Sequence, residues 1–229
     1  PMKRITITSS FIPILVTIIS LSCSSISKEN SGWFNAIQNN NLALVKEYIV
    51  NHIDVNIKDK DGQTALHLAS RLNRDDLIKL LIINGAQIEI HDKDGYTPLM
   101  IAAGLGNDIA LKTLLELGAN IDTEGHMPGY KAIHAVCEHG TVNTIKILVS
   151  HGANINDRIT NSKRTTLMYA VRCDNLPVVQ YLVESNIDLF AEDAMGWTAL
   201  SFADNYRREE IIKYLEEKMN MKHNQKSNQ

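Results

Sequence analysis

A block of about 33 residues recurs along this chain of 229 residues, and this recurrence restricts the possible folds more than any single residue does. Three copies have similar sequences: Gly62–Ala69, Gly95–Ala102 and Gly196–Ala203. Two weaker copies lie between them, at Gly129–Val136 and Lys163–Ala170, and successive copies start 33, 34, 34 and 33 residues apart. A regular period of this length predicts a stack of small units, in which each unit buries its apolar face only against its neighbours.

Each unit carries the signals of two helices followed by a turn. The hydroxyls of four threonines can accept a hydrogen bond from the free amides at the start of a helix: Thr64, Thr97, Thr165 and Thr198. Pro98 suits the first turn of a helix. An apolar stripe with helical spacing follows, as in Leu77, Ile78 and Leu81. Residues that tolerate the left-handed conformation then end most of these second helices, at Gly85, Gly118, Gly152 and Asn186. Asp-rich turns such as Asp59–Gly62 precede the next threonine.

The pattern resembles the ankyrin repeat, whose first half reads D-x-x-G-x-T-P-L-H-x-A and whose second helix ends in G-A-x-x-x. Asp92–Ala102 carries this motif with Met100 at the histidine position, and the resemblance spans residues 32–219. It implies an all-α ankyrin-repeat solenoid of about six helix-turn-helix units with β-hairpin fingers. The expected repeats are 32–60, 61–93, 94–127, 128–161, 162–194 and 195–219. The first repeat has His52 in place of the glycine, and the last has a polar outer face, as terminal caps require.

The segment 1–23 differs from the repeats. Two basic residues precede an apolar stretch, Phe11–Leu21, whose 11 residues are fewer than the roughly 20 needed to span a bilayer, so the pattern is typical of an export signal. Ser20–Cys23 resembles a bacterial lipoprotein signal, although that family usually has leucine where Ser20 stands. The resemblance implies a lipid on Cys23 and a place in the bacterial cell envelope, in the periplasm or at the outer membrane. A signal that is cleaved without lipidation, a retained signal, and a cytosolic chain with an apolar start are the alternatives.

The remaining segments and the composition add four expectations. Residues 24–31 are predicted to be a polar tether and residues 220–229 a disordered tail. The 23 basic and 26 acidic residues give no basic surface of the kind that nucleic-acid binding requires. Cys137 and Cys173 are expected to be buried free thiols, with a disulfide between neighbouring repeats as the alternative.

The sequence predicts no catalytic residue, no metal site and no cofactor. His67 and His134 occupy the same position in two repeats, and the resemblance implies that this histidine ties a finger to a helix by hydrogen bonding. Because Met100 and Met168 fill the same position in other repeats, a zinc site there is not expected. No nucleotide-binding glycine motif or nucleophile motif is present in the sequence.

The variable positions predict where a partner binds. The residues after the turn glycine are Gln63, Tyr96, Tyr130, Arg164 and Trp197, a composition typical of interaction hot spots. We expect partner contacts from Tyr96, Tyr130, Arg164, Trp197, Arg71 and Tyr206, because in ankyrin proteins partners dock in the concave groove of fingers and first helices. The alternative is that these rings only cover the base of each finger. Basic residues decorate the early fingers, at Lys58, Lys60, His91 and Lys93. Together with residues at the ends of the first helices, such as Glu138 and Arg172, they suggest a mixed polar groove that is basic near its start and suits an acidic partner, although charges on a solvated face are the ordinary case.

The sequence therefore predicts a non-enzymatic, monomeric protein–protein interaction module that is exported and membrane-anchored, and that binds a partner protein in the concave groove. One alternative is an immunity- or regulator-type inhibitor of a co-exported enzyme. The other is a structural scaffold in the envelope.

Overall fold

The computed structural model describes the backbone of residues 30–185 and 187–227. The predicted signal with Cys23, the predicted tether as far as residue 29, and the predicted cap at Asn186 lie outside the described residues. The chain divides into two units, of which the first ends at Ile53 and the second begins at Asp54. The predicted first repeat, 32–60, is therefore split between the two units.

The first unit contains two helices. Helical backbone covers residues 30–38, and α2 runs from Leu42 to Val50, with the side chain of Asn41 accepting from the amide of Leu44 at its start. Trp33 is buried and meets the ring of Tyr48 edge-on, with 5.9 Å between ring centroids. Because residues 30 and 31 are already helical, the prediction of a tether up to residue 31 is wrong for these two. His52 adopts φ +63°, the left-handed conformation that glycine supplies after other second helices.

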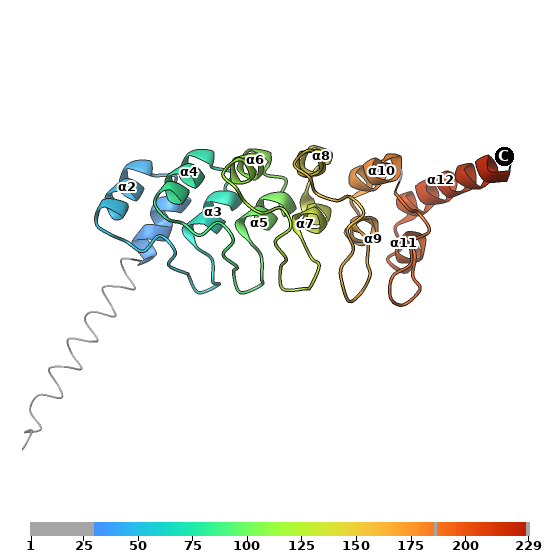
Figure 1. Cartoon of the computed structure of the whole chain (residues 1–229), viewed down its shortest axis with the longest axis horizontal. Helices are drawn as coiled ribbons and strands as arrows, with labels where there is room; N and C mark the ends of the chain where they lie inside the picture. The colour runs from blue at the N-terminus through green and yellow to red at the C-terminus, as the bar shows by residue number, and fades with distance from the viewer. Residues whose placement is uncertain (1–29, 186, 228–229) are drawn as a thin grey trace, which may run out of the picture. The chain divides into compact units, whose positions relative to one another are not determined.

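The second unit consists of five helix pairs (Figure 1). The first helices of the pairs are α3 (Ala65–Arg71), α5 (Pro98–Gly104), α7 (Ala132–His139), α9 (Thr166–Arg172) and α11 (Ala199–Asn205). The second helices are α4 (Asp75–Ile83), α6 (Asp108–Glu116), α8 (Val142–Ser150), α10 (Leu176–Glu184) and α12 (Glu209–Ser227). Each first helix packs on the next first helix along the chain, and each second helix packs on the next second helix. The all-α fold predicted from the repeats is confirmed.

The helices start where the threonines predict. The Thr97 hydroxyl accepts from the amide of Met100 at 3.3 Å, and Thr165 and Thr198 make the same bond to the third residue of α9 and α11. Each bond satisfies a donor that has no partner inside the helix. Lys131 replaces threonine before α7, and there the ring of His134 accepts from the Lys131 amide at 3.1 Å instead.

The apolar stripes of the second helices form the shared interior. Leu77, Ile78 and Leu81 are fully buried, and so are their counterparts Ala110, Leu111, Leu114, Ile145, Leu148, Val178, Val179 and Leu182. In the last repeat Ile211 and Leu215 are buried while Ile212 is half-buried. Burial of this apolar surface between repeats is the main favourable term in the stability of such a stack.

The fingers, by which we mean the loops between the second helix of one repeat and the first helix of the next, are tight turns. In the finger before α5, Asp92 Oδ1 accepts from the amides of Asp94 and Tyr96, and the Asp92 amide donates to the Tyr96 carbonyl at 3.0 Å. Asp59 and Asp193 close their fingers in the same way. Each of these expected β-hairpins is thus held by the bonds of one pair of facing residues. Arg158–Thr165 is the isolated β-bridge among the described residues.

The C-terminal helix differs from the sequence prediction. α12 continues to Ser227, so the prediction of a disordered tail from residue 220 is wrong up to that point. The segment contains no glycine or proline and includes Met221, Lys222 and Gln225, whose types favour helix. The helix propensity of these residues therefore extends α12 although they form no apolar stripe.

Candidate functional site

Each of the two equivalent histidines joins its own helix to the next finger along the chain. His67 Nδ1 accepts from the Thr64 amide at 3.1 Å, so Nε2 carries the proton and donates to the carbonyl oxygen of Tyr96 in the next finger at 3.0 Å. His134 repeats the first bond with Lys131, and its Nε2 lies 3.4 Å from the carbonyl oxygen of Asp157. Burial lowers the pKa of both imidazoles, that of His134 to about 4. The predicted structural role of these histidines is confirmed.

Two residues at the position after the turn glycine, where Arg164 follows Lys163 instead, reach the next finger along the chain. Gln63 Nε2 donates to Asp92 Oδ2 at 3.4 Å, and Arg164 Nε donates to Asp193 Oδ2 at the same distance. Burial alone would raise the pKa of Asp193, but the amides of Trp197 and Met195 and the Arg164 guanidinium outweigh it and lower that pKa. Arg164 is thus partly committed to an internal ion pair.

Two tyrosines converge on one carboxylate oxygen. The hydroxyls of Tyr96 and Tyr130 donate to Glu138 Oε1, at 3.0 Å and 2.8 Å. Burial and the adjacent Glu138 carboxylate raise the pKa of Tyr96 to about 12 and that of Tyr130 further, so both phenols stay protonated donors. The carboxylate is therefore held in place from one side, which fixes the direction of its second oxygen.

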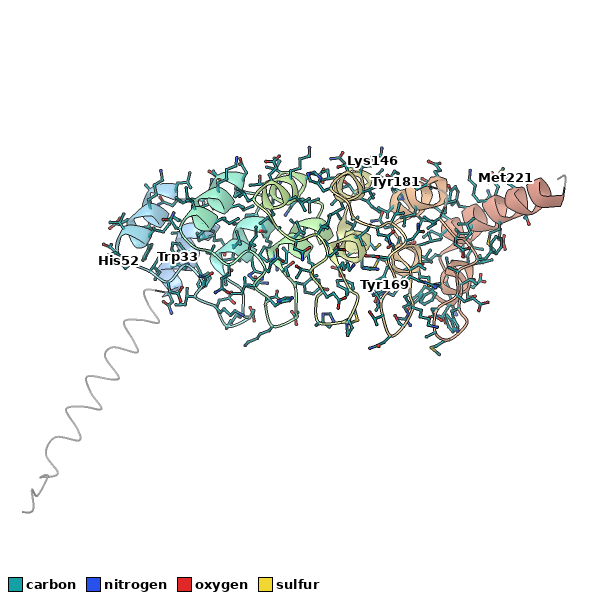
Figure 2. The ribbon with its side chains drawn as sticks, viewed as in Figure 1. Trp33, His52, Lys146, Tyr169, Tyr181 and Met221 are labelled. Carbon is teal, nitrogen blue, oxygen red and sulfur yellow. The ribbon has the colours of Figure 1, made fainter. Side chains whose placement is uncertain are left out.

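Tyr130 lies at the centre of an aromatic cluster. Its ring stacks on His134 at 5.7 Å and meets Tyr96 and Tyr169 edge-on at 6.1 Å and 5.9 Å. The Arg172 guanidinium lies 4.6 Å from the centroid of the Tyr169 ring, and Figure 2 places Tyr169 in the layer of first helices. The cluster joins the finger before α7 to α7 and α9, so it stiffens this part of the surface.

A second cluster surrounds Phe202, which is buried in α11. The Arg164 guanidinium lies 5.1 Å from the Phe202 ring centroid, Trp197 meets the ring edge-on at 5.5 Å, and Tyr206 stacks on it at 6.2 Å. Tyr206 is 41% exposed, so one face of this cluster is open to solvent. Three of the predicted contact residues are therefore neighbours because of a residue that the sequence analysis did not single out.

Between the fingers and the first helices lies a hollow of about 220 Å³. We call the surface around it the groove surface. The finger side is lined by Gln63, Asp92, Asp94 and Tyr96, and the helix side by Arg71, Met100, Ile101, Gly104, Leu105 and Glu138. Three of these residues are acidic and one, Arg71, is basic. The hollow is thus more acidic than the predicted groove, which was mixed in charge and basic near its start.

The finger lysines explain part of that difference. Lys58 Nζ donates to the carbonyl oxygen of His91 at 2.7 Å, and Lys93 Nζ donates to the carbonyl oxygen of Lys60. These side chains therefore bridge adjacent fingers. None of these four residues lines the hollow.

The structure places the predicted contact residues unequally. Arg71 and Tyr96 line the hollow, whereas Trp197, Arg164 and Tyr206 gather around Phe202. Tyr130 is only 2% exposed, so the prediction of direct partner contact needs correction there: its ring supports the surface from below. For Tyr130 the alternative of a covered finger base describes the structure better. Glu138 was named only among the polar residues at the ends of the first helices and not as a contact residue, and Gly104 was missed, although its difference from the equivalent residues of other repeats is visible in the sequence.

The other residue types considered in the sequence add no further site. Cys137 is buried and donates to the Thr166 carbonyl oxygen at 3.3 Å, and both it and the half-buried Cys173 are free thiols. Among the described residues, no group of three or more His, Cys, Asp or Glu side chains could hold a metal ion. No helix in the described ranges is both long and apolar enough to pass through a membrane.

Comparisons with known proteins give the family. The family model described as ankyrin repeats (3 copies) matches residues 33–125 and 122–193. The chain is 35% identical over 77 residues to the mouse ankyrin repeat and SAM domain-containing protein 6, a match that covers 33% of this chain and 9% of the relative. It is 38% identical over 77 residues to the NF-kappa-B inhibitor cactus of Drosophila melanogaster, covering 33% of this chain and 15% of cactus. It is 31% identical over 89 residues to the potassium channel AKT1 of Arabidopsis thaliana, covering 38% of this chain and 10% of the channel.

Each of these matches covers 15% or less of the relative, so the chain resembles only a short region of each. Ankyrin repeats, which the family model describes, serve generally as protein–protein interaction modules. Since the family model covers most of the two units described above, the chain belongs to the ankyrin-repeat family.

Proposed function

We propose that this protein binds one partner protein through the groove surface and catalyses no reaction. The observation that carries the proposal is the hollow, which is lined by side chains of the fingers and the first helices. It lies next to the packed aromatic cluster around Tyr130. A surface held by buried rings and inter-repeat hydrogen bonds loses little conformational freedom on binding, which favours affinity.

Site-specific photo-crosslinking tests this proposal. A photoreactive amino acid is placed at Leu105, which is 39% exposed and lines the hollow, and in a matched variant at Ile83, which is 82% exposed at the end of α4. In the cells that make the protein, we expect a single crosslinked partner from position 105 and none from position 83. Equal crosslinking from both positions, or a partner only from position 83, would reject the groove surface as the binding face.

We further propose that the chain is exported and anchored by a lipid on Cys23. The support is the sequence of residues 1–23, with its basic start, short apolar stretch and small residues around Cys23. The intact mass after expression in a bacterium tests this: we expect a polypeptide that begins at Cys23 with added acyl mass. Cys23→Ser should lose the acyl mass, and an unmodified, full-length wild-type chain would contradict the proposal.

An inhibitor is the second candidate, and the match to cactus, whose name describes an inhibitor, favours it. In this case the groove surface would cover the active site of an enzyme that is exported together with this chain. If the crosslinked partner is an enzyme, its activity should fall in proportion to the amount of protein added. Unchanged activity in the saturated complex would leave binding without inhibition.

A further inference from the structure

The hollow exists because one position in the repeat lacks a side chain. The last turns of the five first helices carry equivalent residues at Arg71, Gly104, Glu138, Arg172 and Asn205, spaced 33, 34, 34 and 33 residues apart. Gly104 therefore separates two long side chains, and Arg71 and Glu138 both line the space that it leaves. A Cβ atom added to Gly104 would lie 3.5 Å from Glu138 Oε2, which shows that this oxygen faces the hollow.

The free oxygen of Glu138 gives the hollow its chemistry. Oε1 accepts from both tyrosine hydroxyls, while Oε2 receives no hydrogen bond within the described part of the chain. Asp94 is exposed and adds a second carboxylate, whereas Asp92 Oδ1 is committed to its own finger. The three acidic residues of the lining outnumber its one basic residue, Arg71, so an acidic ligand would meet mostly carboxylates, and like charges placed together in an interface oppose binding.

The rest of the lining suits a long aliphatic chain. Met100 and Ile101 are buried and Leu105 is 39% exposed, so an apolar surface leads to the carboxylate. Lysine and arginine place their methylene groups along such surfaces and keep the charge at the polar end. The volume of about 220 Å³ is below the roughly 300–1,000 Å³ of small-molecule sites, so the space matches a single side chain.

We propose that this hollow binds a basic side chain, arginine or lysine, from an exposed segment of the partner protein. This inference rests on the proposed function and adds the chemistry of recognition to it. The charged end meets Glu138 Oε2, and the stem lies on Ile101 and Leu105. The two phenol hydrogen bonds hold the carboxylate in position beforehand, so the contact requires little rearrangement.

Selection from a library of short random peptides displayed on phage tests the inference with the full chain as bait. We expect the wild type to enrich peptides that share one basic residue. Glu138→Gln keeps an oxygen that accepts from Tyr96 and Tyr130 but removes the charge, and it should lose this enrichment. Glu116→Gln removes the same charge from α6, outside the hollow, and should enrich the same peptides as the wild type.

The affinity of one enriched peptide is then measured by fluorescence anisotropy. Replacing its arginine by citrulline, a neutral group of similar shape, or using Glu138→Gln should weaken binding about tenfold or more, since hydrogen bonds to charged groups are the stronger kind. Gly104→Met, which fills the hollow and changes no charge, should weaken it similarly. Circular dichroism checks that each variant is folded, and if Gly104→Met is not, Glu138→Gln decides alone.

The outcomes separate this inference from the proposed function. The proposal of a basic side chain would be overturned by any of three results: the enriched peptides are acidic or apolar, Glu138→Gln binds them as well as the wild type does, or no peptide is enriched at all. If the crosslink from position 105 still captures one partner, the groove surface stands and only its chemistry is wrong. If the crosslink also fails, both are wrong.

Discussion

Asn175, directly before α10, donates from Nδ2 to the carbonyl oxygen of Gly140, which follows α7 in the preceding repeat, at 2.9 Å. Its side-chain oxygen also accepts from the amide of Val178 at 3.3 Å, so one side chain serves a helix start and a helix end. Asn107 makes the helix-end bond in the same way, donating to the carbonyl oxygens of Ser70 and Arg71 at the end of α3. The carbonyls at the end of a helix have no partner within it, so these bonds satisfy groups that adjacent repeats would otherwise leave open.

Asn175→Ala should therefore lower the free energy of unfolding by about 1–3 kcal/mol, the range of a lost helix cap together with an unsatisfied carbonyl. Urea denaturation followed by circular dichroism measures the change. Asn161→Ala, in an exposed finger position with no side-chain hydrogen bond among the described residues, is the matched control and should have little effect. Equal losses in both variants would show that the inter-repeat bond contributes nothing.

The buried histidines predict a loss of stability in mild acid. Burial lowers the folded-state pKa of His134 to about 4 and also lowers that of His67, while an unfolded histidine titrates near 6.5. Between these values the unfolded state binds more protons, so their contribution is complete above about pH 6.5 and is lost as the pH falls toward 4. Each histidine changes the free energy of unfolding by at most about 1.4 kcal/mol per pH unit in this window.

Unfolding curves between neutral pH and about pH 4.5 check this slope. His67→Met with His134→Met should flatten it, because methionine fills the same position in α5 and α9. His139→Gln, which changes an exposed histidine at the end of α7, should leave the slope unchanged. A slope that survives the double substitution would assign the acid sensitivity to other groups.

Two glycines at the ends of neighbouring first helices should respond oppositely to alanine. A Cβ atom on Gly104 would lie 3.4 Å from the nearest atom, an ordinary contact, whereas one on Gly140 would lie 2.5 Å from the Val136 carbonyl oxygen. We expect Gly104→Ala to be neutral or stabilising by up to about 1 kcal/mol through helix propensity. Gly140→Ala should cost about 1–3 kcal/mol through overpacking. Thermal unfolding of the pair distinguishes them, and a reversed order would contradict the packing around α7.

The thiols should differ in reactivity. Burial raises the pKa of both Cys137 and Cys173, but Cys137 is fully covered while Cys173 is half-buried beside Arg172. Since the thiolate is the reactive form and access limits the rate, iodoacetamide should modify Cys173 before Cys137 in the folded protein. Mass spectrometry of the digested protein after increasing times gives the order. Faster modification of Cys137, or similar rates at both residues, would indicate that the layer of first helices opens readily.

The repeat itself could be predicted from the sequence because its determinants are local. Thr97 caps a helix that begins at the next residue, and Leu77, Ile78 and Leu81 face the interior through helical spacing alone. The same reasoning failed at Met221, where helix propensity continues α12 without any apolar stripe to announce it.

The site was harder because its residues act across repeats. Tyr96 and Tyr130 are equivalent in sequence, yet one is half-buried and the other is 2% exposed, since Tyr130 alone lies between His134 and Tyr169. The hollow depends on a missing side chain at Gly104 and on what stands one repeat before and after it. Comparison of equivalent positions can find a missing side chain such as that of Gly104. It cannot show whether neighbouring side chains fill the space.

Three contacts to the next finger along the chain, Gln63 with Asp92, His67 with Tyr96 and Arg164 with Asp193, each join residues 29 positions apart. The same rule of attachment therefore operates early and late in the chain. A gene that gains or loses a whole repeat keeps this spacing wherever such a pair is retained, so the number of units can evolve without a new mode of joining at those places. What such an event would change is the row of outward side chains, and with it the choice of partner.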